Sequence, residues 1–299
     1  MSRGLGDVYK RQLSTLQNAG FDPLGMEAFF ERLQQNNRWY ENASTAYIST
    51  HPMTSERMSD MQNRTRHMSP VTHRDSMDFF LVKARARVLQ ETTYDGSLKV
   101  SNSLETELKR HPAGYSLVAT QYGLSVAYAK MNQKDKALTA IRAAKAASKE
   151  NSVILDKHLA ELTYQVAKTQ AQKDQALALA KSTCNQYPYS GLAASNYVEL
   201  LFQSGKHQEL VNYLRNQSAL SRSNPDYHMY LARSYEALGK KSMAFAATGD
   251  MYALLDNPRA AVYQFELAQK ANDGDFYIMS EIDAKLREQR QKVLDQKKD

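Results

Sequence analysis

The chain has few of the residues and motifs on which several protein classes depend. A single cysteine, Cys184, excludes an internal disulfide and any metal or redox site built on a CxxC pair. No apolar run approaches the roughly 18 residues of a membrane-spanning helix, so no transmembrane segment is predicted. Phosphate-binding glycine motifs and the G-x-S-x-G nucleophile elbow are also missing, which argues against P-loop, dinucleotide-binding and serine-hydrolase chemistry.

The residues that are present point to a folded helical protein. Apolar residues make up 42% of the 299 residues, against only 12 glycines and 7 prolines. The net charge of +7 comes from 39 basic and 32 acidic residues. Most charges are interspersed, as in Gln172-Lys173-Asp174-Gln175, which is typical of solvated helical faces, with an anionic partner as the alternative. Without zinc-finger spacing, a glycine-rich RNA motif or a dense basic run, we expect no nucleic-acid partner.

A repeat with a period near 34 residues runs through the last two-thirds of the chain. Its small-residue slot, where two helices meet closely, falls at Ala137, Ala176, Leu210 and Ala244. The spacings are 39, 34 and 34 residues, and an overlapping set starts half a period later at Ala261. A period of about 34 residues is typical of tetratricopeptide repeats, in which antiparallel helix pairs stack. The sequence therefore predicts an all-α protein with a tetratricopeptide-type α-solenoid over residues 76–299.

Position within the repeat separates expected core residues from expected binding residues. The side chains expected to pack inside are Cys184, Tyr128, Tyr235 and Tyr252. The first helix of each pair usually lines a concave face. The residues predicted there, as a protein-binding surface, are Tyr122, Val126, Glu199, Phe202, Met229, Arg233 and Glu236. They mix aromatic, apolar and both kinds of charged side chain, which suits a peptide or protein partner better than a phosphate backbone.

The first dozen residues, 1–12, read differently from the rest. They show neither a helical apolar stripe nor a capping pattern, and they resemble a translated sequencing-adapter scar. We therefore expect a non-native segment whose natural start has been lost, with a natural polar tail as the alternative. If the start is lost, the missing signal peptide says nothing about the compartment.

Residues 13–75 predict helices separated by turns. Gly20 suits the left-handed stop of a first helix. Asp22 then caps a second helix with Pro23 at its first position, where a missing N–H costs nothing. The buried stripe predicted for this helix consists of Met26, Phe29, Phe30 and Leu33.

Four motifs in this order carry a specific resemblance. They are Gly20-Phe21-Asp22-Pro23, Phe29-Phe30-Glu31-Arg32-Leu33, Thr50-His51-Pro52-Met53-Thr54-Ser55-Glu56-Arg57 and Asp78-Phe79-Phe80-Leu81-Val82-Lys83-Ala84-Arg85. The pattern resembles the periplasmic gluzincin zinc metallopeptidases of the BepA (beta-barrel assembly-enhancing) type, from just after their zinc site into their tetratricopeptide domain. The resemblance implies that residues 13–75 are the last helices of a peptidase domain and a linker. It also implies a periplasmic role in outer-membrane protein quality control and assembly, with outer-membrane proteins or their assembly machinery as partners.

The sequence departs from that family where catalysis would take place. The family holds zinc with H-E-x-x-H on one helix, and the glutamate activates the bound water. That motif is missing from the 299 residues, and no two of the seven histidines are four residues apart. The position of the third ligand falls on Asp7, inside the predicted scar, with Tyr9 and Gln12 in place of the expected Asp and Gly. We treat Asp7 as a coincidence and expect this chain to be inactive.

One metal-related residue matches the family. His51 lies in the T-H-P loop, whose histidine can serve the family as a regulatory extra zinc ligand. The resemblance makes His51 such a candidate in the intact parent only, and the alternative is an ordinary loop histidine. We expect zinc in the parent and no cofactor in this fragment.

Two functions therefore stand at this stage. The first is a fragment of a zinc metalloendopeptidase that retains mainly its protein-binding repeats. The second is a stand-alone tetratricopeptide scaffold without enzymatic activity. An H-E-x-x-H reading frame directly upstream would favour the first, and a natural start near Met26 with unrelated DNA before it would favour the second.

Overall fold

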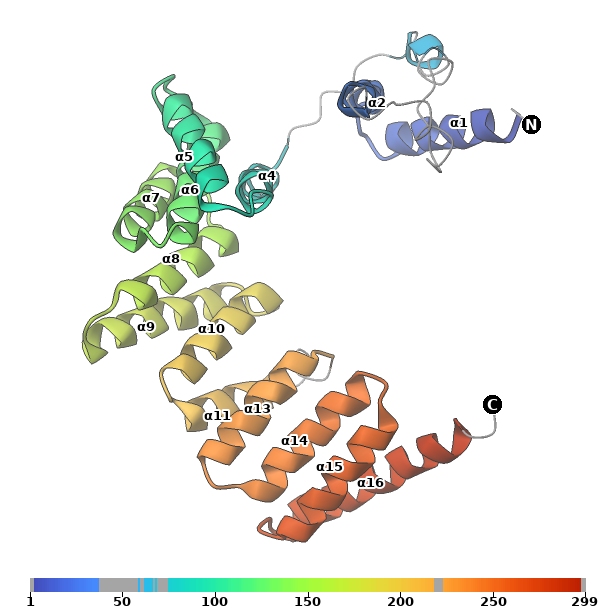
Figure 1. Ribbon diagram of the computed structural model, residues 1–299, viewed down its shortest axis with the longest axis vertical. Helices are drawn as coiled ribbons and strands as arrows, with labels where there is room; N and C mark the ends of the chain where they lie inside the picture. Colours follow the sequence, from blue (N-terminus) through green and yellow to red (C-terminus); the bar gives the residue numbers. More distant parts are fainter. Residues whose placement is uncertain are drawn as a thin grey trace. The chain divides into compact units, whose positions relative to one another are not determined.

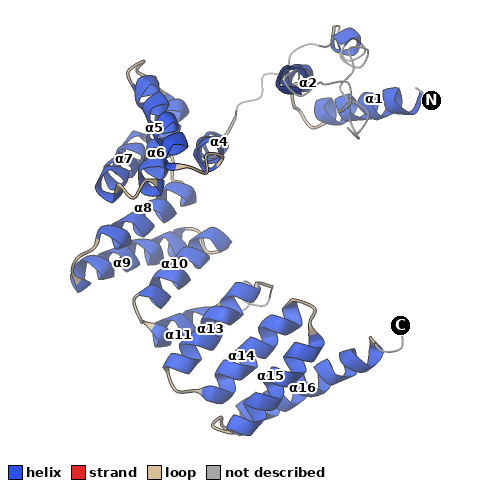
Figure 2. Cartoon of the chain, in the orientation of Figure 1, coloured by secondary structure: helices blue, strands red, loops and turns tan. Residues whose placement is uncertain are grey.

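The computed structural model describes residues 3–37, 59, 62–66, 68, 75–217 and 223–296. All regular secondary structure in these ranges is helical (Figure 2), so the prediction of an all-α protein is confirmed for them. The chain divides into two compact units, Met1–Ser76 and Met77–Asp299. None of the described helices combines the length and apolar character needed to cross a membrane.

The first unit contains helices α1 (Arg3–Asn18) and α2 (Leu24–Asn37). Gly20 has a φ of +75°, as its predicted stop position requires. The carboxylate of Asp22 accepts a hydrogen bond from the backbone N–H of Leu24 at 3.0 Å, which confirms its role as a cap. Helix α1 also extends through most of the predicted scar, where no helix was expected. No proline interrupts the chain before Gly20, so nothing prevents that extension.

The buried stripe predicted for α2 is wrong. Phe29 is 59% exposed and lies with its ring 5.5 Å from that of Phe30, which is itself only half-buried. The side chain of Leu33 lies outside the described residues. The buried residues described in this unit are Leu13, Pro23 and Thr65, and the Thr65 hydroxyl donates to Glu27 on α2 at 2.7 Å. A helical spacing of apolar residues shows which face is apolar, but it does not show that enough partners exist to cover it.

The second unit is a succession of helices most of which pack mainly on their sequence neighbours, whereas α4 packs mainly on α6 (Figure 1). Its elements are α4 (Met77–Leu89), α5 (Tyr94–Leu108), α6 (Gly114–Lys130), α7 (Lys134–Ala147), α8 (Val153–Val166), α9 (Gln170–Gln186), α10 (Gly191–Gln203), α11 (His207–Asn216), α13 (Pro225–Ala237), α14 (Lys241–Leu254), α15 (Pro258–Ala271) and α16 (Phe276–Asp295). Three hydrophobic clusters follow one another along this order. Tight turns at Gly205 and Gly239, with φ of +69° and +74°, reverse the chain between paired helices.

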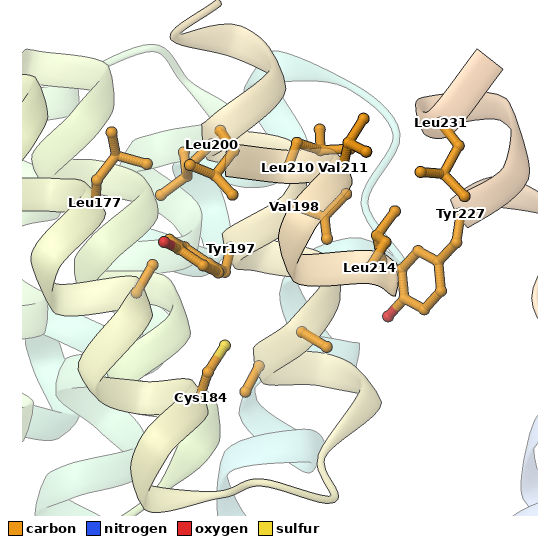
Figure 3. Packing of buried hydrophobic residues seen from close by; sticks show 14 of the residues in the cluster. Leu177, Cys184, Tyr197, Val198, Leu200, Leu210, Val211, Leu214, Tyr227 and Leu231 are labelled. Atoms are coloured by element: carbon orange, nitrogen blue, oxygen red, sulfur yellow. The ribbon is translucent and has the colours of Figure 1, made fainter. Parts of the chain in front are cut away.

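The small-residue slots confirm the repeat register at most positions. Ala137, Ala176, Leu210 and Ala261 are completely buried. Figure 3 shows part of the middle cluster, to which Leu177 of α9, Tyr197 of α10 and Leu210 of α11 belong. Cys184 is buried in the same cluster, as predicted. Ala244 differs because it is half-buried, and its side chain lines a groove described below.

Two buried serines fasten helix pairs in the same way. Ser125 on α6 donates its hydroxyl to the carbonyl of Ala137 on α7 at 2.7 Å. Ser242 on α14 donates to the carbonyl of Ala268 on α15 at 2.9 Å. Each serine hydroxyl is buried, and the hydrogen bond satisfies it with a carbonyl of the neighbouring helix. The bond also holds the two helices close together. The α14–α15 pair thus uses the same device as an ordinary repeat pair, in line with the overlapping final repeat predicted at Ala261.

One predicted detail needs correction. Helix α5 begins with Thr93 as its cap, whose side chain accepts a hydrogen bond from the Gly96 N–H at 3.0 Å. Of the tyrosines expected in the core, Tyr235 is buried, whereas Tyr128 and Tyr252 are half-buried. A phenol can keep its oxygen at the surface while its ring packs, and the Tyr128 hydroxyl does so by donating to Glu105 at 2.5 Å.

Candidate protein-binding surface

The predicted binding residues on α6 do not form a surface. Tyr122 and Val126 are 1% and 5% exposed. The Tyr122 ring lies edge-on to His158 of α8, with 5.5 Å between ring centroids, and its hydroxyl accepts from Arg85 of α4 at 3.5 Å. Helices before and after α6 therefore cover the face that was expected to be open. The prediction that Tyr122 and Val126 bind a partner is therefore wrong, because both residues are part of the packed interior.

The two predicted residues on α10 have mixed environments. Glu199 is exposed and accepts a hydrogen bond from Gln203 one turn later at 3.1 Å. Phe202 is half-buried, with its ring centroid 5.6 Å from His207 and 5.3 Å from Tyr230 of α13. Phe202 therefore belongs first to the contact between α10 and α13. Only part of its side chain is open to a partner.

The three predicted residues on α13 lie together in one groove. It has a volume of about 660 Å³ and is bounded by α13, α14 and α15. Its lining residues are Met229, Ala232, Arg233, Glu236, Gly239, Lys241, Ala244, Phe245, Thr248, Met251, Gln264, Leu267, Lys270 and Ala271. On each helix they recur every three or four positions, with one adjacent pair per helix, so each helix contributes a single face. This groove brings Met229, Arg233 and Glu236 together, as the sequence predicted for one side of the first helix.

The groove exists because several of its wall residues are small. Ala232, Gly239, Ala244 and Ala271 leave space that larger side chains would fill. The floor, α14, is held against α15 by an unusually close contact: a Cβ built on Gly249 would lie 2.8 Å from two ring carbons of Phe265. This close approach fixes α14 against α15, while Lys241, Ala244 and Thr248 of α14 line the groove.

Sequence reasoning missed the residues that α14 and α15 contribute. Phe245 and Met251 come from α14, and Leu267 and Lys270 come from α15. The prediction placed binding residues only on the first helix of each pair. The overlap signal at Ala261, which makes α14 both a second and a first helix, contained the information needed to find them.

The charges on the groove are unbalanced. Arg233, Lys241 and Lys270 face it, against the single carboxylate of Glu236. In residues 75–217 and 223–296, these three cations form no salt bridge with an acidic side chain. The nearby Asp273 is engaged elsewhere, because its carboxylate accepts the backbone N–H groups of Lys241 and Ser242, each at 2.7 Å. The Ser242 side chain and these backbone groups lower the pKa of Asp273.

The opposite face of α14 has a different character. A smaller cavity of about 200 Å³ lies there, with Asp250 of α14 and Lys285 of α16 among its lining residues. Lys285 bridges Asp250 and Glu281, each at 2.8 Å. Burial alone would lower the pKa of Lys285, but the two carboxylates outweigh it and raise that pKa. These charges compensate one another, so we interpret the ion pair between Lys285 and Asp250 as a contact that holds α16 against α14.

No metal centre is found in the part of the chain that the structure describes. No group of three or more His, Cys, Asp or Glu side chains gathers there as metal ligands would. His51, the candidate regulatory ligand, lies outside the described residues. Its role stays a prediction for the intact parent.

The sequence is similar to curated proteins that are named as proteases of one type. The chain is 26% identical over 242 residues to the "Beta-barrel assembly-enhancing protease" of Escherichia coli (strain K12), covering 81% of this chain and 47% of that protein. The "Putative beta-barrel assembly-enhancing protease" of Vibrio cholerae is 23% identical over 279 residues, covering 92% of this chain and 55% of that protein. The chain resembles the beta-barrel assembly-enhancing proteases. It spans about half the length of these curated relatives, and the resemblance found in the sequence motifs is confirmed.

Solved structures with helical repeats were also found. A tetratricopeptide repeat protein from Parabacteroides merdae matches with a TM-score of 0.42 and 11% identity, covering 87% of this chain and 98% of that one. The structure titled "MamA MSR-1 C2" matches with a TM-score of 0.43 and 17% identity, covering 60% and 97%. No family model matches the sequence.

Proposed function

We propose that this chain is the protein-binding part, with one helical flank, of a zinc metalloendopeptidase of the beta-barrel assembly-enhancing type. The parent would act in the periplasm on the quality control and assembly of outer-membrane proteins. The observation that carries the proposal is the 26% identity over 242 residues, which extends across both compact units. In this proposal residues 13–75 are the last helices of the peptidase domain and a linker, and residues 76–299 recruit substrate or the assembly machinery.

The groove between α13, α14 and α15 supports a recognition role. It combines an apolar floor with charged residues at its rim, the arrangement found in many protein interfaces. Side chains such as Met229, Phe245 and Leu267 can bury apolar groups of a partner, while Arg233 and Glu236 select among polar ones. The surface predicted on α6 is not part of this argument, because Tyr122 and Val126 are buried.

Catalysis is assigned to the parent and not to residues of this chain. A gluzincin site requires two histidines one turn apart and a downstream acidic ligand, and the 299 residues lack the first of these elements. The residues present therefore do not fit a catalytic zinc. His51 is the candidate extra ligand that regulates zinc in the intact enzyme.

The experiment measures binding of the purified chain to a urea-unfolded outer-membrane porin by biolayer interferometry. The comparison partner is an unfolded soluble protein of similar length and charge. We expect binding to the porin that is at least about tenfold tighter, because the chain would be adapted to such clients. Equal affinity for both partners would favour the stand-alone scaffold, and no binding to either would refute a protein-binding role.

The stand-alone scaffold is the second candidate, favoured by the missing H-E-x-x-H motif. The gene sequenced through its 5′ end separates the two. An H-E-x-x-H reading frame that continues into this chain supports the protease. A natural start near Met26, preceded by unrelated DNA, leaves only the scaffold.

A further inference from the structure

The groove between α13, α14 and α15 has two chemically different ends. These three helices run in alternating directions side by side (Figure 1), so residue order locates each side chain along the groove. Lys241 and Lys270 lie near the end where Gly239 turns α13 into α14. Met229 and Met251 lie towards the opposite end. A ligand in the groove would therefore meet positive charge at one end and apolar surface at the other.

The positive charge is available to a ligand. Arg233, Lys241 and Lys270 are exposed, and Glu236 alone offsets them within the groove. Asp273, the next carboxylate at that end, already accepts two backbone N–H groups of α14. The cavity on the other face of α14 shows the contrast, since its lysine is bridged by two carboxylates. Packing of the helices therefore does not use the three cations on the groove.

The apolar part of the groove suits side chains on an extended backbone. A volume of about 660 Å³ is enough for several side chains of an extended segment. The small residues Ala232, Ala244 and Ala271 allow a polypeptide backbone to come close to α13, α14 and α15. Phe245 and Leu267 then provide contacts for an inserted apolar side chain.

We propose that this groove binds an extended segment of a partner polypeptide in which a carboxylate lies a few residues from a large apolar side chain. The carboxylate lies between Lys241 and Lys270, with Arg233 alongside, and the apolar side chain packs on Met229, Phe245 and Leu267. The proposal deepens the proposed function and rests on it, because it names the chemistry of the segment that the repeats recognise. The charge of the groove indicates the charge of the partner segment. Three cations without a salt bridge favour an acidic segment over a neutral or basic one.

The first experiment selects binders from a library of random twelve-residue peptides displayed on phage, using the immobilised full chain. We expect selected peptides to be enriched in Asp or Glu within a few positions of Leu, Phe or Met. Binders without an acidic residue, or binders rich in Lys and Arg, would overturn the inference while leaving a protein-binding function intact. If neither the library nor the unfolded porin yields binding, the proposed function itself fails.

The second experiment places the selected peptides on the groove. Affinities of synthetic selected peptides are measured by fluorescence polarisation for the original chain and for K241E/K270E. We expect the charge reversal to weaken binding at least about tenfold at low salt and much less at about 0.5 M salt, where exposed charges are screened. The matched control, K109E/K149E, changes two exposed lysines outside the groove by the same total charge.

The control variant and a variant of the apolar contact on α15 decide between the outcomes. Equal loss in K109E/K149E would mean that only net charge matters, and unchanged affinity in K241E/K270E would place the peptides elsewhere; either result overturns the proposal. Leu267→Ser is expected to weaken binding about fivefold or more without changing the salt dependence, because it removes apolar contact and no charge. Binding to anionic lipid vesicles with no peptide selection would instead assign the cations to a membrane surface.

Discussion

Gly249 shows how a single missing side chain can determine the spacing of two helices. A Cβ at this position would lie 2.8 Å from the Cε1 and Cζ atoms of Phe265, whose ring is 1% exposed. We expect Gly249→Ala to destabilise the second unit by about 1–3 kcal/mol, because the ring has no free space to move into. Urea unfolding followed by circular dichroism measures the change. Gly191→Ala is the matched control, since nothing lies within 4 Å of a Cβ built there, and an equal loss in both variants would contradict the explanation.

Glu161 links the packing around Tyr122 to pH. Its carboxylate lies 2.7 Å from Lys157 and 3.8 Å from the ring of the buried His158. Burial alone would raise the pKa of Glu161, but His158 and Lys157 outweigh it and lower the pKa to about 2. A carboxylate with a lowered pKa stabilises the fold above its ordinary value of 4.5, and that contribution is lost as the pH falls towards about 2.

The corresponding prediction concerns the acid limb of the stability curve. Glu161→Gln should flatten the loss of unfolding free energy between about pH 4.5 and 2, since the variant has no carboxylate to protonate there. Urea midpoints measured at intervals across this range test it. Glu288→Gln is the control, because Glu288 pairs with Lys292 in an exposed position on α16. An unchanged acid limb in Glu161→Gln would refute the assignment.

At the scale of elements, α14 is the helix on which the site depends. One face, including Ala244 and Phe245, lines the groove, and the other, including Asp250, lines the cavity beneath α16. The sequence predicted its helical character and its close partner α15. It did not predict that Ala244 would face a groove, because the small-residue slot of a repeat is normally filled by the next helix.

In the final helix, α16, local spacing likewise predicts one kind of contact and not another. Ile282 and Leu286 are four positions apart and so lie on one face of α16, and both residues are 2% exposed. The bridge from Lys285 to Asp250 joins residues 35 positions apart, a distance over which helical periodicity carries no information. The packed face of a helix can thus be read from local spacing, whereas its polar fastening depends on the register between helices.

Lys285 supplies the test of that fastening. We expect Lys285→Ala to loosen α16 by about 1 kcal/mol, because Asp250 and Glu281 lose their shared cation in a partly buried place. Hydrogen exchange should then accelerate by about fivefold in the amides of α16 and little in α10. Lys292→Ala, which removes an exposed pair with Glu288, is the comparison. Similar acceleration in both variants would mean that the bridge to α14 contributes nothing specific.

At the scale of the whole molecule, periodicity was a good guide to architecture and a poor guide to exposure. The all-α fold, the stacked pairs and the buried Cys184 followed from spacing alone. Tyr122 and Val126 were placed on an open face, yet both are buried, and Tyr122 contacts Arg85 of α4 and His158 of α8. A one-dimensional pattern identifies the helix pairs of a stack, but the number of neighbours that cover a given face follows from the assembled array.

The last prediction concerns catalysis by the chain as a whole. With zinc supplied, the purified chain should not hydrolyse casein above background, because its 299 residues contain no H-E-x-x-H pair to hold the metal and polarise water. Calorimetric titration should likewise show no one-site binding at micromolar zinc, since His51 alone provides a single ligand. Cleavage that a chelator stops would contradict the assignment of catalysis to the parent. Zinc binding that His51→Ala abolishes would show instead that the loop histidine belongs to a metal site within this chain.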